Sequence, residues 1–278
     1  MGSGIAEVCA RAGMDVTVVE LDSEREEAAR QRVDRSLERA VGAGKLDPAD
    51  RAGAAERLAY TTTIEDLAGA DLAIEAIVES EPAKREVFHR LDRVLPDAHF
   101  LASNTSSVPI MKLAAETSRP ERILGLHFFN PVPVLRLVEV VRSIMTSDAV
   151  ITEAKAFIDE LDKEAIDSQD RAGFVVNALL VPYLLSAIRM YESGFASKED
   201  IDRGMVLGCA HPMGPLALSD LIGLDTLQSV AESMHDEFRD PSNVSPPLLN
   251  RMVEAGLMGR KTGRGFYNYE EDGGKSGG

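Results

Sequence analysis

The 278-residue chain carries 30 basic and 46 acidic residues, so its formal net charge is −16. An acidic surface of this size repels phosphate backbones, which argues against general nucleic-acid binding and leaves any anionic ligand to be held by local groups. The length is sufficient for one large domain or two ordinary ones, with a sizeable core in either case.

The first part of the chain, up to about residue 168, alternates short apolar strands with amphipathic helices. An apolar helical pattern opens the sequence. The expected strands follow at 16–20, 58–61, 72–77, 100–103, 123–127 and 135–140. Strand–helix alternation of this kind predicts a Rossmann-like, mostly parallel sheet covered by helices on both faces.

From Arg171 onward the pattern becomes helical throughout. The expected helices are 174–191, 198–207, 216–238 with a break at Gly223, and one after Pro246-Pro247. The composition change therefore predicts an α/β domain over 1–168 and an all-α domain over 169–278. The segment 174–188 is apolar nearly all round, which is typical of a deeply buried helix or a subunit interface. We expect both, in a homodimer.

The sequence carries no signal for secretion or for a membrane. No basic-then-apolar leader opens it, and the most apolar segment, 174–188, is too short to span a bilayer. Both cysteines, Cys9 and Cys209, fall in apolar helical patterns, which suits a reducing compartment. We therefore expect a cytoplasmic protein with no membrane partner.

The opening residues MGSG, followed by a helix and by a strand that ends at Glu20, resemble the later part of a dinucleotide-binding βαβ unit. An acid at that strand end accepts hydrogen bonds from a ribose 2′-hydroxyl and repels a 2′-phosphate, which favours NAD over NADP. The alternative is a solvated acid. Such a unit has a first strand and two glycines ahead of the position of Gly2, and the printed sequence does not contain them. As it stands, we expect weak NAD binding and a gap in the sheet.

His127 lies in GLHFFNPVP, at the end of an expected strand and in apolar surroundings. A lone histidine there is more often a hydrogen-bonded core residue than a catalyst. Glu139 in the next expected strand favours catalysis, because a carboxylate within an apolar strand is costly unless it is paired. If the two strands adjoin, the pair forms a base–carboxylate dyad suited to removing a hydroxyl proton as hydride leaves the same carbon.

Further polar candidates accompany this pair. SNTSS at 103–107 follows a strand at the carboxyl edge of the sheet, where open α/β sheets bind ligands; the alternative is helix capping by Ser106 or Ser107. Asn177 in an apolar helix needs a partner, either a substrate oxygen or a neighbouring backbone group. Glu79 and Lys84 flank the start of a helix, and their alternative is an exposed ion pair of little energetic weight. No His, Cys or Asp spacing fits a metal site, so no metal is expected.

Taken together, these stretches resemble the 3-hydroxyacyl-CoA dehydrogenase family, and most closely its bacterial 3-hydroxybutyryl-CoA dehydrogenase branch. The likeness runs from Gly2, which matches the third glycine of the NAD-binding fingerprint, to about Tyr269. The motifs that carry it, in family order, are SNTSS, GLHFFNPVP, LVEVV, FVVNALLVPYL, HPMGPL and GRKTGRGFYNY. Two positions depart from the family pattern: Ala178 stands where an arginine is usual and Ala172 where a proline is usual.

The resemblance implies NAD-dependent oxidation of an (S)-3-hydroxyacyl-CoA, of short chain length, to the 3-ketoacyl-CoA. His127 then matches the general base and Glu139 its orienting carboxylate, while Ser106 and Asn177 match residues that contact the substrate oxygen and help to place the nicotinamide. The positions that resemble cofactor contacts are Gly2, Glu20, Glu79, Lys84, Ser106, Asn130 and Lys261. The helical half resembles a dimerisation and substrate domain.

Two other functions stay open at this point. The chain could be a non-catalytic structural or binding relative of the same fold, which the incomplete phosphate-binding turn favours, or a dehydrogenase of a free hydroxy acid such as gulonate. The intact set of His127, Glu139, Ser106 and Asn177 favours the acyl-CoA dehydrogenase, because a non-catalytic protein has no physical need for polar groups in apolar strands and helices.

Overall fold

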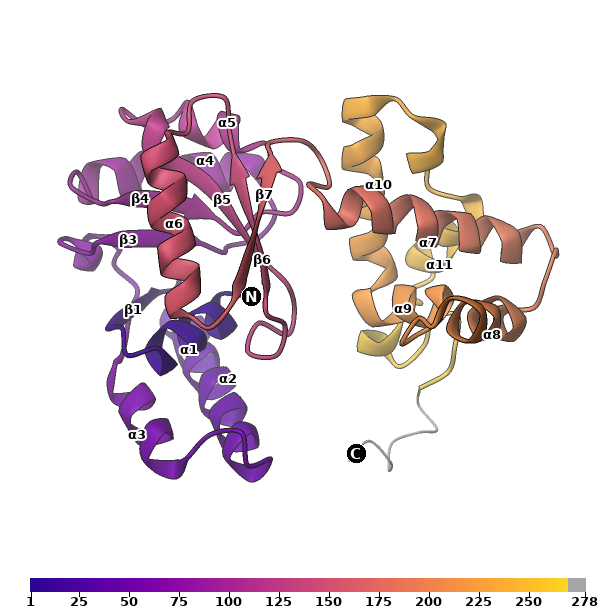
Figure 1. Cartoon of the computed structure of the whole chain (residues 1–278), viewed down its shortest axis with the longest axis horizontal. Coiled ribbons are helices and arrows are strands. Elements are labelled where there is room, and N and C mark those ends of the chain that lie inside the picture. Colours follow the sequence, from indigo (N-terminus) through magenta and orange to yellow (C-terminus); the bar gives the residue numbers. More distant parts are fainter. Residues whose placement is uncertain (270–278) are drawn as a thin grey trace. The chain divides into compact units, whose positions relative to one another are not determined.

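The computed structural model describes residues 1–269. They fold into two compact units, one of Met1–Arg171 and one that begins at Ala172 (Figure 1). Each unit has its own hydrophobic core. The first unit is an α/β structure and the second is entirely helical, so the predicted fold class is confirmed.

The strands of the first unit fall into two groups. Strands β1 and β2 pair in parallel, and a separate five-stranded sheet has the order β3-β4-β5-β6-β7, in which only the β5–β6 pair is antiparallel. No pairing joins β1 to β3 within residues 1–269. The strand bounds are β1 Val16–Val19, β2 Leu58–Thr61, β3 Leu72–Glu75, β4 Phe100–Ser103, β5 Ile123–Phe128, β6 Leu137–Arg142 and β7 Glu164–Gln169.

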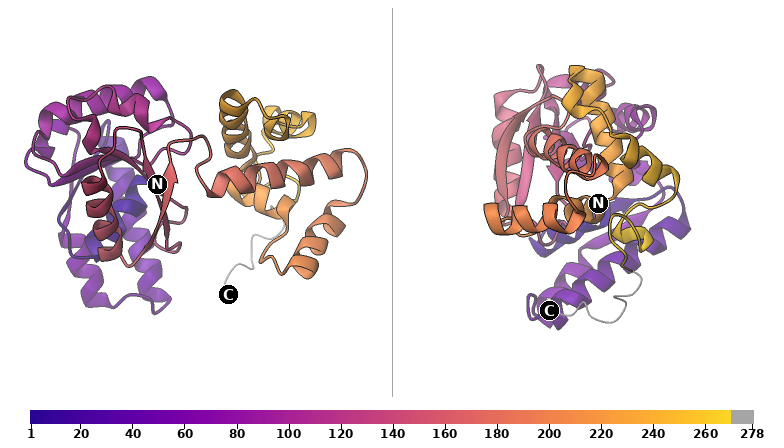
Figure 2. Two further views of the ribbon diagram at one scale, coloured as in Figure 1. Left: turned by 45° about the horizontal axis from the view of Figure 1, so that its top comes forward. Right: turned by 90° about the vertical axis from the view of Figure 1, so that its right-hand side faces the viewer.

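Helices cover both faces of the five-stranded sheet (Figures 1 and 2). Leu124 and Leu126 of β5 belong to the core cluster that also contains α1 and α6 residues. Gly125 between them faces the other way, since a Cβ there would lie 2.9 Å from Ile110 Cδ1 of α5. The helix bounds are α1 Gly2–Arg11, α2 Ser23–Gly42, α3 Pro48–Glu56, α4 Glu81–Val94, α5 Ile110–Ala114 and α6 Asp148–Glu160.

Strand β7 is absent from the sequence-based prediction, although it lies beside β6 along its whole length. Its sequence, EAIDSQ, is polar and alternating, and only Ser168 in it is buried. An edge strand can expose one side to water, so it gives a weaker hydrophobic signal than the central strands β4 and β5, which are buried throughout.

The second unit is a bundle built around α7 (Val176–Glu192), which contacts each of the other α-helices of the unit. In Figure 1, α7 crosses α10, which it contacts. The remaining helices are α8 Lys198–Cys209, α9 Pro215–Ile222, α10 Leu224–Phe238 and α11 Pro247–Glu254. The predicted break at Gly223 is confirmed, because that glycine has a φ of 102° and separates α9 from α10.

Helix α7 buries only one side within its own unit. Leu184, Leu185 and Ile188 are fully buried, whereas Leu179 is 75% exposed. The apolar surface of α7 is therefore only partly buried by the bundle core.

Among residues 1–269, no helix combines the length and the hydrophobicity that spanning a bilayer requires.

Two buried aspartates hold the end of the described chain against this bundle. Asp220 accepts hydrogen bonds from the backbone N–H groups of Phe266 and Tyr267, both at 2.9 Å. Asp202 accepts from the N–H of Leu216 at 2.7 Å, at the start of α9. The hydroxyl of Tyr267 also donates to Asp202 at 2.9 Å, which ties the two carboxylates to one segment.

Candidate active site

His127 and Glu139 face each other across the antiparallel β5–β6 pair, in the register that places one directly opposite the other. The Nδ1 atom of His127 lies 2.6 Å from Oε2 of Glu139. Their exposed fractions are 7% and 0%. The ring of Phe129 packs against the imidazole, with 4.6 Å between centroids. The buried carboxylate thus has the imidazole as a partner and holds the ring in one orientation.

The alternation of side chains along β5 produces this arrangement. Leu124, Leu126 and Phe128 point into the core beneath α6, so Gly125 and His127 point to the opposite face. A side chain at Gly125 is excluded, since its Cβ would lie 2.8 Å from the Cβ of Val141. His127 is the second-last residue of β5, at the carboxyl edge of the parallel strands, where open α/β sheets bind their ligands.

Glu79 organises the turn that carries Ser106. One of its oxygens, Oε1, accepts hydrogen bonds from the Thr105 hydroxyl at 2.5 Å, the Ser106 N–H at 2.9 Å, and the Ser107 N–H and hydroxyl at 3.0 and 2.8 Å. The other oxygen, Oε2, lies 3.1 Å from the Lys84 ammonium. The structure thus brings Glu79 and Lys84 together with the 103–107 turn, and Glu79 is the acceptor for most of that turn.

These donors control the charge of Glu79. Burial raises the pKa of its carboxyl group, but the hydrogen bond from Thr105, the charge of Lys84 and the bonds from Ser107 and Ser106 lower the pKa to about 2. Glu79 is therefore ionised throughout the neutral range.

Lys84 is not an exposed surface lysine, and that alternative is wrong. Its side chain is 1% exposed and its ammonium lies 2.7 Å from Oε1 of Glu75, whose side chain is fully buried. Glu75 was missed by the sequence analysis, which assigned it only to a strand. The signal was available, because an acid inside the apolar stretch LAIEAIV is costly unless it is paired, the same argument that identifies Glu139.

The 103–107 turn is also tied to the strand that carries His127. The side-chain oxygen of Asn104 accepts a hydrogen bond from the N–H of Phe128 at 2.9 Å, and the N–H of Asn104 donates to the carbonyl of Glu75 at 2.8 Å. Asn104 thus links the ends of β3, β4 and β5. Ser106 itself is partly buried.

The alternative role of Ser106 or Ser107 as a helix cap is wrong. Helix α5 begins at Ile110 after Pro109, and its first N–H groups, those of Ile110 and Met111, donate to the carboxylate of Asp170 at 2.7 Å each. The cap comes from a residue 60 positions away in sequence, which local pattern reading cannot detect. Ser106 and Ser107 therefore belong to the 103–107 turn and do not cap α5.

The start of α1 is closely packed and built from small residues. A Cβ on Gly4 would lie 3.0 Å from the Cβ of Val132, and a Cβ on Gly2 would lie 3.6 Å from the Cβ of Ala76. The first turn of α1 therefore lies against the β5–β6 loop and the residue that follows β3. Backbone approach of this kind, at the N-terminal end of a helix, fits the part of a dinucleotide site that receives a pyrophosphate.

Glu20 follows directly after β1, and its N–H donates to the carbonyl of Thr61 at 3.0 Å. Its side chain is partly exposed. Arg32 of α2 contacts the start of α1, with its Nε 3.3 Å from the hydroxyl of Ser3. The carboxylate at this strand end fits a ribose with a free 2′-hydroxyl.

Three further predicted residues lie elsewhere. Asn130 is exposed in the β5–β6 loop. Asn177 is partly buried in the first turn of α7, and Lys261 pairs with Asp225 at 2.5 Å. Asn177 and Lys261 thus belong to the second unit, whereas His127 belongs to the first. The roles given to these three residues stay predictions.

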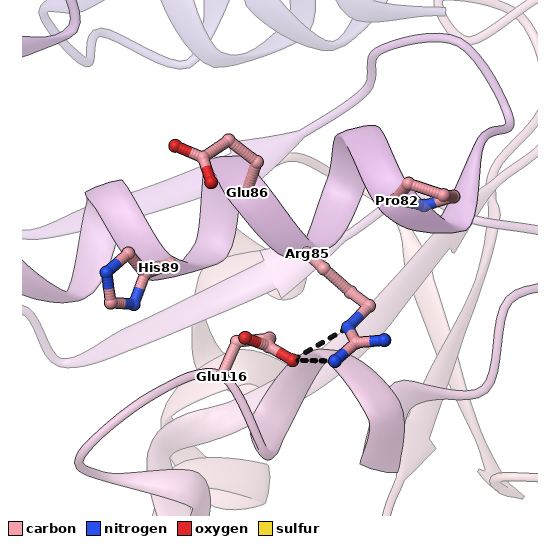
Figure 3. Close-up of a pocket in the computed structure, with 5 residues that line it drawn as sticks. All are labelled: Pro82, Arg85, Glu86, His89 and Glu116. Atoms are coloured by element: carbon pink, nitrogen blue, oxygen red, sulfur yellow. Dashed lines mark hydrogen bonds and ion pairs between the residues drawn. The ribbon is translucent and has the colours of Figure 1, made fainter.

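A second place on the first unit, the outer side of α4, carries a shallow hollow of about 340 Å³ (Figure 3). Arg85 reaches across it to Glu116, with 2.7 Å between Nε and Oε1. The hollow is lined by Pro82, Arg85, Glu86, His89 and Glu116. Because Glu116 already neutralises the arginine, the hollow offers no unpaired charge to an anion. Within residues 1–269, no group of three or more His, Cys, Asp or Glu side chains could hold a metal ion.

Comparison with known proteins agrees with this geometry. Residues 1–171 match the family model described as 3-hydroxyacyl-CoA dehydrogenase, NAD binding domain, and residues 173–269 match its C-terminal domain. A 3-hydroxybutyryl-CoA dehydrogenase of Mycobacterium tuberculosis is 58% identical over 272 residues, which cover 97% of this chain and 95% of that protein.

Solved structures give the same result. The crystal structure of FadB2 from M. tuberculosis matches with a TM-score of 0.95 at 58% identity, covering 97% of this chain and 95% of that one. (S)-3-Hydroxybutyryl-CoA dehydrogenase PaaH1 from Ralstonia eutropha matches with a TM-score of 0.92 at 44% identity, with the same coverage. This chain therefore belongs to the 3-hydroxyacyl-CoA dehydrogenase family.

Proposed function

We propose that this protein is an NAD-dependent (S)-3-hydroxyacyl-CoA dehydrogenase, acting on short acyl chains such as 3-hydroxybutyryl-CoA. The observation that carries the proposal is the buried His127–Glu139 pair, 2.6 Å apart at the carboxyl edge of the sheet. Relatives at 58% and 44% identity bear the name 3-hydroxybutyryl-CoA dehydrogenase, which supports the same substrate class.

In the direction of oxidation, His127 removes the proton of the 3-hydroxyl group through Nε2, and C3 becomes a carbonyl as its C–H bond breaks. Bound NAD supplies the acceptor for the hydride. Glu139 keeps the imidazole oriented through Nδ1 and stabilises the positive charge that the ring gains with the proton. Ser106 and Asn177 are assigned to the substrate oxygen, and Ser106 is held for this task by the Glu79-centred turn.

The residues at the carboxyl edge fit NAD rather than NADP. Glu20 places a carboxylate where an adenosine ribose would lie, and a 2′-phosphate there would be repelled. Gly2 and the small residues beside it allow the pyrophosphate to approach α1. Glu79, Lys84, Asn130 and Lys261 are the further residues proposed to bind the cofactor.

The test is the rate of NADH oxidation, followed at 340 nm with acetoacetyl-CoA as substrate. We expect turnover that depends on CoA, falls at least tenfold when NADPH replaces NADH, and gives the (S)-3-hydroxy product. No absorbance change at saturating NADH and acetoacetyl-CoA would favour the non-catalytic relative. Equal turnover of free acetoacetate or of a free hydroxy acid would favour the dehydrogenase of a free acid.

We also propose that the helical unit forms a homodimer. The number of large apolar residues that this unit exposes supports the proposal, because exposed apolar surface can mark a protein interface. They are Val175, Leu179, Met190, Phe195, Leu207, Leu221, Ile222 and Val244. A cytoplasmic location is proposed on the cysteines: Cys9 and Cys209 are both free thiols, which suits a reducing compartment.

A further inference from the structure

Three charged side chains cluster where β3 meets α4, in the interior of the first unit. The ammonium of Lys84 lies 2.7 Å from Oε1 of Glu75 and 3.1 Å from Oε2 of Glu79. The side chains of Glu75 and Lys84 are 0% and 1% exposed, whereas that of Glu79 is 34% exposed. The charged atoms of Lys84 are therefore enclosed between two carboxylates, which limits their access to any bound molecule.

Glu75 fixes two turns at once. Its Oε1 atom accepts the N–H of Ile77 at 2.6 Å, just after β3, and its Oε2 atom accepts the Ser103 hydroxyl at 2.6 Å, at the end of β4. The Ser103 oxygen in turn accepts the N–H of Thr105 at 3.2 Å. Every partner in this chain of contacts is a backbone group or a short, buried side chain, so the turn after β4 has little freedom.

The contacts continue to Ser106 and to the strand of His127. Through Lys84, the Glu79 carboxylate is held where it accepts the N–H of Ser106 at 2.9 Å. Asn104, next to Ser103, accepts the N–H of Phe128, which follows His127 in β5. The cluster thus fixes the positions of Ser106 and His127 relative to each other, and its only contact with the Ser106 hydroxyl among the described residues is a long one, 3.5 Å from Oε1 of Glu79.

We propose that Glu75 and Lys84 are positioning residues for the dehydrogenase reaction, which hold Glu79 and the 104–107 turn so that the Ser106 hydroxyl stays in register with His127. This inference rests on the function proposed above and adds a positioning role to the cofactor-side place already proposed for Lys84.

The energetics of buried ion pairs support a positioning role over a purely stabilising one. Taking charges out of water costs about as much as their attraction returns, so a well-packed apolar cluster of the same volume is often as stable. The fold alone therefore does not require Glu75 and Lys84. Apolar side chains, however, cannot donate to Glu79 or accept from Ser103, so the turn would lose its fixed geometry. A misplacement of about 1 Å at a reacting group can lower turnover about 10²-fold.

The test compares Lys84→Met with Lys112→Met. Lys112 pairs with Glu81 at 2.7 Å on the exposed side of α4 and serves as the matched ion pair. We expect Lys84→Met to lower kcat for acetoacetyl-CoA reduction, measured at saturating NADH, about 10- to 100-fold. The Kd of NADH, measured by fluorescence, separates this effect from any change in cofactor binding. Lys112→Met should keep the parental kcat. A raised Kd of NADH with an unchanged kcat would mean that Lys84 acts on cofactor binding alone and would overturn the positioning role.

Ser103→Ala provides the second variant, because it removes only the hydroxyl between Glu75 and Thr105 and leaves the charges in place. We expect kcat to fall about 3- to 10-fold with the Kd of NADH unchanged. If Lys84→Met does not fold, this variant decides the question, and a parental kcat would overturn the proposal. A parent chain without any CoA-dependent turnover would instead overturn the proposed function, so the two failures are distinguishable.

Discussion

Oε2 of Glu139 lies 2.6 Å from Nδ1 of His127, and the two residues are direct neighbours across an antiparallel strand pair. The antiparallel pairing brings the two residues together, because the chain reverses direction after β5 and β6 runs back beside it. A pair formed by strand register, rather than by loops, is held rigidly and is suited to keeping an imidazole ready for proton transfer.

Glu139→Gln tests the orienting carboxylate. The amide cannot stabilise the imidazolium and can hydrogen-bond the wrong tautomer, so we expect kcat to fall about 10²-fold, less than the loss of the base itself. Stopped-flow or steady-state absorbance at 340 nm measures this. Glu164→Gln on β7, an exposed carboxylate whose side chain is 71% exposed, is the control and should keep parental turnover. Parental turnover in Glu139→Gln would remove the orienting role.

Acidification should weaken the fold through Glu79. The pKa of its carboxyl falls from 4.5 to about 2 on folding, so the folded state binds fewer protons than the unfolded state in this range. The stability that the ionised Glu79 contributes to the fold is complete above about pH 5 and is lost as the pH falls toward 2. With a side chain 34% exposed, solvent screening reduces it to about 2 kcal/mol. Urea unfolding should show that the parent has a higher free energy of unfolding than Glu79→Gln at neutral pH and that this difference disappears near pH 2. A difference that does not depend on pH would contradict the lowered pKa of Glu79.

Substitution of glycine by alanine is expected to have opposite effects on stability at Gly265 and at Gly53. A Cβ at Gly265 would lie 2.0 Å from Oδ1 of Asp220, a carboxylate that is 1% exposed and held by backbone N–H groups. Gly265→Ala should therefore lower the free energy of unfolding by about 3 kcal/mol. Gly53 in α3 has open space around it, and Gly53→Ala should raise stability by about 0.5–1 kcal/mol. Equal Tm values for the two variants would show that the Asp220 segment is loosely packed.

The proposed homodimer is tested at Leu179, which is 75% exposed on α7. A charge in an apolar interface is left unpaired, so Leu179→Glu should convert the dimer to a monomer with little change in the fold. Light scattering after size exclusion measures the mass. Ile144→Glu is the control in the first unit, where the residue is 92% exposed, and it should leave the mass unchanged. A monomeric parent, or a dimeric Leu179→Glu, would contradict the proposed interface.

Much of this structure follows from local pattern. Strands β2 and β4 begin and end at the predicted residues, and the helix pair broken at Gly223 is found as expected, because apolar runs and a glycine break are local signals. The His127–Glu139 contact was predictable because a buried acid in an apolar strand requires a partner.

The remaining features depend on contacts between distant segments. Asp170 caps α5 from 60 residues away, and Lys84 is buried only because Glu75 and Glu79 converge on it. A sequence pattern around Lys84 shows a polar helix start and gives no sign of this burial. Strand β7 escaped prediction because an edge position allows a polar sequence.

The most direct test of the account is His127→Gln, assayed for NADH oxidation with acetoacetyl-CoA at saturating NADH, together with the Kd of NADH measured by fluorescence. The base supplies a proton-transfer advantage of about 10²- to 10⁴-fold, so we predict a loss of kcat in that range with the Kd within twofold of the parent. A variant that turns over at the parental rate would contradict the assignment of His127 as the base.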